Sequence, residues 1–111
     1  MAKSNKDVKI TIKVSGEGDF TYDPSVKRIK AGESITWVSS QGPFSISFKD
    51  GTPFEQLDFH SELAGKEWRI SSGKLGALPG PGHFHYAVAV FSVKDETVYL
   101  DAACPEVIVT N

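Results

Sequence analysis

Two histidines, His83 and His85, are the residues of this sequence best suited to chemistry. They lie two positions apart in the run 82–90, whose apolar residues recur at every second position, as in a strand. Residues at i and i+2 project from one face of a strand, so the two imidazoles suit a divalent metal ion. A further ligand from His60 or Cys104 would strengthen such a site. The alternative is that both are ordinary histidines on a partly solvated strand face.

Other reactive side chains do not form a recognisable catalytic set. Cys104 is the single cysteine and forms no disulfide within the chain, so it is either a buried, inert thiol or a reactive thiol beside an imidazole. Glu55, Asp58 and Glu62 are spread over one irregular stretch, and nothing places them as an acid–base pair. The stretch 71–76 contains Gly and Lys without the spacing of a phosphate-binding loop. We therefore expect that the protein is not an enzyme.

Large apolar residues gather in the stretch 49–82, where the periodic pattern weakens. Four of them form a candidate binding patch: Phe54, Leu57, Phe59 and Trp68. One interpretation is that they cover an open end of the fold. The other is that part of the group is exposed and recognises a partner protein, a sugar or another small ligand, because loops on a rigid scaffold carry most binding residues.

Short strands are the elements that must position these side chains. The stretch 8–14 alternates without a fault and places its Val and Ile residues inward. Further strands are expected over 26–29, 34–39, 44–48, 82–90, 97–100 and 106–110, a strand or none over 66–71, and a short helix or no regular structure over 54–63. Seven or eight short strands separated by Gly and Pro predict an all-β fold, an antiparallel Greek-key β-sandwich. We expect one domain over 8–111 and a flexible N-terminal segment over 1–7.

The composition and net charge of the chain limit the classes of partner that we expect. The chain has 111 residues, of which 40% are hydrophobic and 23% charged, as in one ordinary globular domain. Its net charge of -2 gives no electrostatic reason to expect nucleic acid or an anionic membrane as partner. The polar N-terminus lacks a signal peptide's apolar run. The sequence as written predicts a soluble, cytoplasmic protein, or a periplasmic one if a signal peptide precedes it, and leaves the oligomeric state open.

Three segments together resemble the cupredoxins, the Greek-key sandwiches typified by plastocyanin and azurin. The segment 29–38 is similar to the family's strand ending in "VTWVN", 43–48 to its "PHNVVF", and 82–88 to its "GTYSFYC". The ending 100–109 is similar to the "LDPEIIV" close of uncharacterised bacterial cupredoxin-like proteins that lack copper ligands. The resemblance implies a cupredoxin-like fold over most of residues 8–110.

The same resemblance implies that the copper site is vacated. A blue-copper centre needs two imidazoles and one thiolate, usually with a weak axial thioether. The family's first histidine falls on Phe44 and its cysteine on Val88. The segment 89–96 would bring the second histidine and the methionine and contains neither, and Met1 is the only methionine. The resemblance implies a binding or interaction module without a cofactor; the alternative is a metal-binding protein with a rebuilt histidine site.

Overall fold

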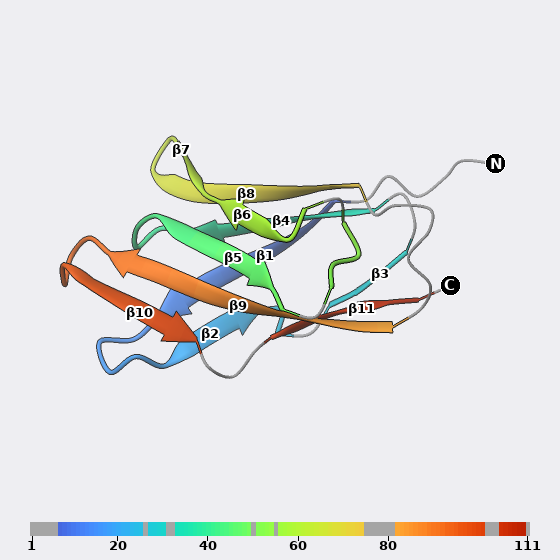
Figure 1. Ribbon diagram of the computed structural model, residues 1–111. Helices are drawn as coiled ribbons and strands as arrows, with labels where there is room; N and C mark the ends of the chain where they lie inside the picture. The colour runs from blue at the N-terminus through green and yellow to red at the C-terminus, as the bar shows by residue number, and fades with distance from the viewer. Residues whose placement is uncertain are drawn as a thin grey trace.

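The described part of the chain folds as two β-sheets that face each other (Figure 1). The computed structural model describes residues 7–25, 27–30, 33–49, 51–54, 56–74, 82–101 and 105–110, and its regular elements there are all strands. In the view of Figure 1, β5, β9 and β10 lie in front of β1 and β4. The core fills the space between these two layers.

The first sheet has five strands. Its order is β2 (Phe20–Asp23), β1 (Asp7–Val14), β4 (Ser34–Ser39), β8 (Glu67–Lys74) and β7 (Glu62–Ala64). β1 is the strand that the sequence predicts most clearly, and its Val8, Ile10, Ile12 and Val14 are all buried. Asp7, expected in the flexible N-terminal segment, is instead the first residue of β1. Its carboxylate accepts hydrogen bonds from the hydroxyls of Ser34 and Thr36.

The second sheet is built around the long central strand β9. Its order is β3 (Lys27–Ile29), β11 (Glu106–Val109), β9 (Gly82–Ser92), β5 (Phe44–Phe48) and β6 (Asp58–His60), and β10 (Thr97–Asp101) also pairs with β9. β11 pairs with the first part of β9 and β10 with its last part. The expected hairpin turn over 93–96 joins β9 to β10. This arrangement places the candidate histidines at the start of β9.

The expectation of an all-β fold is confirmed, but two details of it are wrong. The sheets are mixed, because β1 pairs with β4, and β11 with β3, in parallel. Alternation shows which face of a strand is buried and says nothing about the direction of its neighbours, so a parallel pair leaves no mark in the sequence. The described residues also form eleven strands where seven or eight were expected. Two of the additional strands, β6 and β7, have three residues each and lie in the stretch of weak pattern.

Aromatic side chains form the centre of the core. Trp37 is completely buried, and its ring centroid lies 5.5 Å from that of Tyr86 and 6.1 Å from that of Phe59. Phe48 and Phe54 contact the same cluster, mostly edge to face, the geometry that aromatic pairs prefer. The indole Nε1–H of Trp37 donates a hydrogen bond of 3.2 Å to the hydroxyl of Tyr86. The two sheets are therefore joined by ring contacts and a buried polar link.

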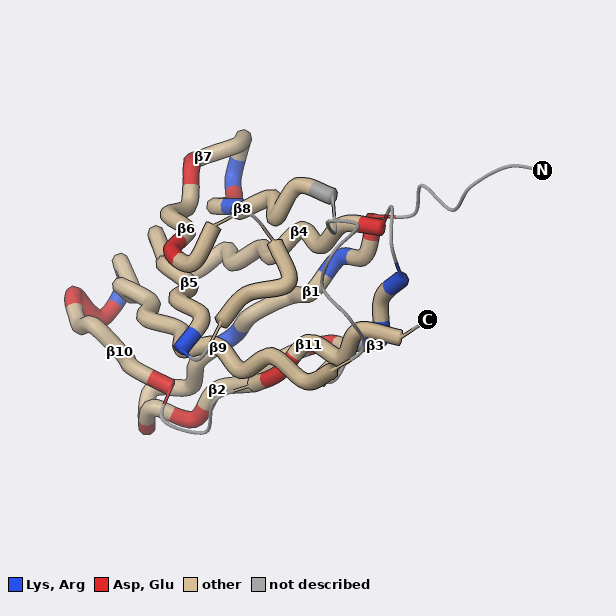
Figure 2. Tube along the Cα trace, turned by 45° about the vertical axis from the view of Figure 1, so that its right-hand side comes forward, with Lys and Arg blue, Asp and Glu red and all other residues tan. Residues whose placement is uncertain are grey.

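The surface carries charges of both signs. Lysine and arginine (blue) are interspersed with aspartate and glutamate (red) over both sheets (Figure 2). Among the described residues there is no helix of the length and apolar character that crossing a membrane requires.

Candidate functional site

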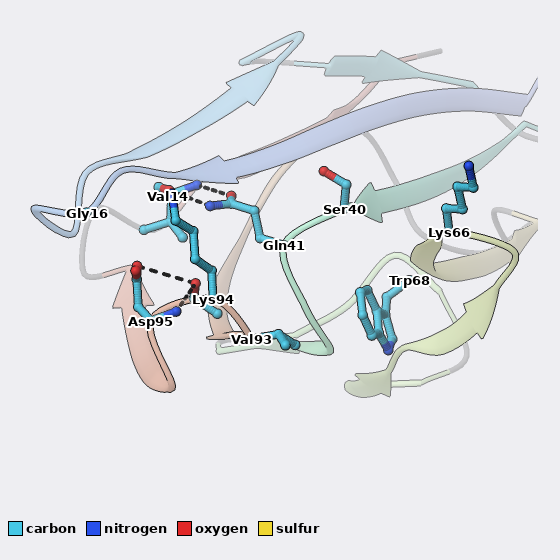
Figure 3. Close-up of a pocket in the computed structure, with 10 residues that line it drawn as sticks. Val14, Gly16, Ser40, Gln41, Lys66, Trp68, Val93, Lys94 and Asp95 are labelled. Carbon is cyan, nitrogen blue, oxygen red and sulfur yellow. Dashed lines mark hydrogen bonds between the residues drawn. The ribbon is translucent and has the colours of Figure 1, made fainter.

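The described part of the chain has a hollow at one end of the sandwich. It has a volume of about 610 Å³, and we call it the end hollow (Figure 3). Its walls come from the end of β1, the β4–β5 turn, the start of β8 and the β9–β10 hairpin. The lining residues are Val14, Gly16, Ser40, Gln41, Lys66, Trp68, Ser92, Val93, Lys94 and Asp95.

Gln41 holds three of these walls together. Its side-chain Oε1 accepts a hydrogen bond of 2.6 Å from the Val14 amide, and its Nε2 donates one of 2.7 Å to the Val14 carbonyl (Figure 3). Its backbone carbonyl accepts a hydrogen bond of 3.0 Å from the Val93 amide. One side chain and one carbonyl therefore connect β1, the β4–β5 turn and the hairpin, so this part of the end hollow is preformed.

The rest of the end hollow combines an aromatic ring with polar groups. Trp68 is partly buried and is the second residue of β8. Its register partners are Ser39 of β4 on one side and Leu63 of β7 on the other. Lys66, Lys94 and Asp95 are exposed and line the same hollow. A pocket with an aromatic wall and a few polar groups is the usual form of a small-molecule site.

Gly42 permits the close contact between the β4–β5 turn and the hairpin. A Cβ atom at this position would lie 1.7 Å from the backbone oxygen of Phe91, which is impossible without a shift of backbone. We expect Gly42→Ala to lower the free energy of unfolding by about 1–3 kcal/mol, measured by urea denaturation. Gly16→Ala is the control, because a Cβ at Gly16 meets nothing within 4 Å. Equal stability of the two variants would contradict the prediction.

The candidate patch of four apolar residues does not form one exposed surface. Phe54 and Phe59 are only 6% and 4% exposed and belong to the core. Leu57 is 49% exposed, and Trp68 lines the end hollow. Phe54 and Phe59 are therefore not available as an exposed binding surface. The sequence does not separate the two pairs, because no alternation in this stretch shows which side chains turn inward.

The two histidines of β9 contact the carboxylate of Glu106, which the sequence did not indicate as a candidate residue. The Nδ1 of His83 and the Nε2 of His85 each lie 3.1 Å from Oε2 of Glu106. Glu106 is the register partner of His85 on β11, so both side chains project from the same face of the sheet. Glu106 lies 23 positions after His83, and only the pairing of β11 with β9 brings them together.

The other proposed metal ligands are elsewhere. His60 pairs with Ser45 of β5, whose partner on the other side is Ala89 of β9, so His60 is separated from His85 by a strand and by four positions along β9. Cys104 lies outside the described residues. Within those residues, no group of three or more His, Cys, Asp or Glu side chains is placed so that it could hold a metal ion.

Neither a protein-family model nor a curated protein matches this sequence.

The two positions that the cupredoxin resemblance assigns to copper ligands lie in the core. Phe44 on β5 is 4% exposed and Val88 on β9 is 2% exposed. Val88 pairs with Ile46, two positions along β5 from Phe44, so the two side chains are diagonal neighbours on the inner face of the second sheet. Hydrocarbon occupies both positions, and neither side chain can donate electrons to a metal.

Proposed function

We propose that the protein is a copper-free, cupredoxin-like module of Greek-key type that binds a ligand and catalyses no reaction. The location of Phe44 and Val88 supports the first part of this proposal. They occupy neighbouring strands, face the same core and are buried, as expected of a ligand pocket rebuilt with apolar side chains. Electron transfer at these positions would require nitrogen and sulfur ligands, which they do not supply.

The ligand site in this proposal is the end hollow, and the ligand is a small sugar. The observation that carries it is Trp68, an aromatic ring in a hollow that also presents an amino group, a carboxylate and a hydroxyl. The ring offers a flat apolar surface to the carbon-bound hydrogens of a sugar, and Lys94, Asp95 and Ser40 are within the same hollow to bind its hydroxyls. The volume of about 610 Å³ is in the range of small-ligand pockets.

Nuclear magnetic resonance tests this proposal with an internal control, because the chain has two tryptophans. We expect maltose, cellobiose or chitobiose to shift the indole Nε1–H signal of Trp68 in a saturable way. The corresponding signal of Trp37 should stay in place, since that indole is completely buried and bonded to Tyr86.

Variants of the end hollow sharpen the test. Trp68→Ala and Lys94→Ala should each weaken binding at least about tenfold, as loss of a central contact does. Leu100→Ala is the matched control, because Leu100 is 73% exposed and lies outside the end hollow. The sugar proposal is wrong if none of the three disaccharides gives a saturable shift at millimolar concentrations, or if the Trp68→Ala variant binds as the parent does.

A further inference from the structure

We propose that the edge of β10 pairs with the same strand of a second copy of this chain, in an antiparallel dimer with two-fold symmetry. β10 has a neighbour on one side only: it pairs with β9, and no other described strand is hydrogen-bonded to it (Figure 1). Its two most exposed residues, Val98 and Leu100, do not line the end hollow. This inference therefore goes beyond the proposed sugar binding and does not depend on it.

The backbone of β10 presents hydrogen-bonding groups along this edge. In an antiparallel pair, alternate residues direct their N–H and C=O groups away from the neighbouring strand. Among the described residues, no backbone–backbone hydrogen bond outside the pairing with β9 engages residues 97–100. A strand edge of this kind is a template on which a further strand can pair.

The other edges of the two described sheets carry features that discourage such pairing. β3 has two cations in three residues, Lys27 and Arg28, and β2 ends next to Pro24, while β6 and β7 have only three residues each. Short strands, charged side chains and proline are the means by which proteins protect a sheet edge. β10 has five residues, keeps an unbroken register with β9 and contains no lysine, arginine or proline. Among these edges, β10 is therefore the least protected.

The outward face of β10 is apolar. Val98 and Leu100 are 60% and 73% exposed, and Phe91, the register partner of Val98 on β9, is 39% exposed. Together with Val93 they give the β9–β10 hairpin four of the six large apolar side chains that are exposed in the described part of the chain. Large apolar side chains that gather in one place mark an interaction surface, whereas single ones scattered over a surface do not.

A second copy of the chain fits this surface by symmetry. In an antiparallel pair with Tyr99 on the two-fold axis, Val98 of each chain lies opposite Leu100 of the other. The two Val–Leu pairs share one face and continue the apolar row that Phe91 begins on β9. Asp101, the one charged residue of β10, is buried, so no exposed like charges meet across the axis.

Sedimentation velocity of the full chain at concentrations from about 10 μM to about 1 mM tests the dimer. An interface built on one short strand pair is small, so we expect a dissociation constant in the micromolar to millimolar range. Val98→Lys and Leu100→Lys should each weaken dimerisation at least about tenfold, because a lysine on the edge would have to lose water on pairing. Leu63→Lys is the matched control: Leu63 is 62% exposed on β7, and its replacement should leave the dimer unchanged. Circular dichroism shows whether the variants keep the β-sheet signal.

Disulfide cross-linking tests the register of the pair. Val98→Cys and Leu100→Cys are made as separate chains, each with Cys104→Ser, which removes the only native cysteine. A mixture of the two chains should form a disulfide-linked dimer under mild oxidation, because residues that lie opposite each other have Cβ atoms about 4.5–5.5 Å apart. Either chain alone should form far less, because its two cysteines would be diagonal neighbours about 7–8 Å apart.

Three outcomes would overturn the proposal. The first is a parent chain that stays monomeric over the whole concentration range. The second is a Leu63→Lys variant whose dimer is weakened as much as those of the two β10 variants. The third is a mixture of the two cysteine chains that yields no more cross-linked dimer than either chain alone.

Discussion

Replacing Trp37 with alanine is expected to lower the free energy of unfolding by about 3–5 kcal/mol, among the largest losses that a core truncation causes. Trp37 is completely buried. Its ring lies between 5.5 and 6.5 Å from the rings of Tyr86, Phe59, Phe54 and Phe48, so its removal opens a cavity in the centre of the aromatic cluster. The hydroxyl of Tyr86 also loses its hydrogen-bond donor. Guanidinium denaturation followed by circular dichroism measures the change.

Two further variants control this experiment. Trp68→Ala removes the same side chain from the edge of the core and should lower stability by a clearly smaller amount, because Trp68 is only partly buried. If the alanine variant at position 37 does not fold, Trp37→Phe keeps part of the ring volume and should show an intermediate loss. A loss below about 1 kcal/mol on Trp37→Ala would contradict the central place of this residue.

The second large effect is a loss of stability at alkaline pH through Tyr86. Burial raises the pKa of Tyr86 from the ordinary 10.0 to about 12, an effect reduced by the hydrogen bond from Trp37 and increased by the charge of Asp101. The neutral phenol is thus favoured in the folded state, while the unfolded chain loses this proton near pH 10. The stability of the folded state that depends on this neutral phenol is complete below pH 10 and is lost as pH rises toward 12. The free energy of unfolding falls by at most about 1.4 kcal/mol per pH unit through this group, and by about 2–3 kcal/mol in total.

Comparison with Tyr86→Phe isolates this effect from other groups that titrate at high pH. Phenylalanine leaves Nε1 of Trp37 without its acceptor and should cost about 1–3 kcal/mol at neutral pH. Between pH 10 and 12, however, the variant should lose less stability than the parent chain by about 2–3 kcal/mol. Denaturation curves at several pH values measure how the free energy of unfolding of each protein changes with pH. Parallel curves for the two proteins would show that Tyr86 ionises in the folded state as it does in the unfolded one.

Local sequence was sufficient to predict the strands that have one face on the core and the other toward solvent. β1 and β5 each have one face on the core and one toward solvent, and in both the strict alternation of apolar residues gave the correct strand and the correct buried face. The same alternation in β9 correctly placed His83 and His85 on the exposed face. In these segments a single periodic signal decides both the conformation and the orientation.

Features that depend on contacts between distant segments were not predictable in this way. Phe54 and Phe59 belong to a stretch whose conformation is set by the pairing of β6 with β5, so the sequence could not show that both turn inward. Glu106 looks like any other charged residue until β11 is placed beside β9. The end hollow likewise has walls from four separate segments of the chain, and no motif joins them.

The place of β11 between β3 and β9 has a consequence for synthesis of the chain on the ribosome. Every strand of the first sheet lies between Asp7 and Lys74, so that sheet can form as soon as this part of the nascent polypeptide has emerged. β3 emerges early too, but its partner in the second sheet is β11, whose residues 106–109 are translated much later. Until then the apolar inner surface of the first sheet lacks its complete cover, and this interval is when a chaperone would have most to bind.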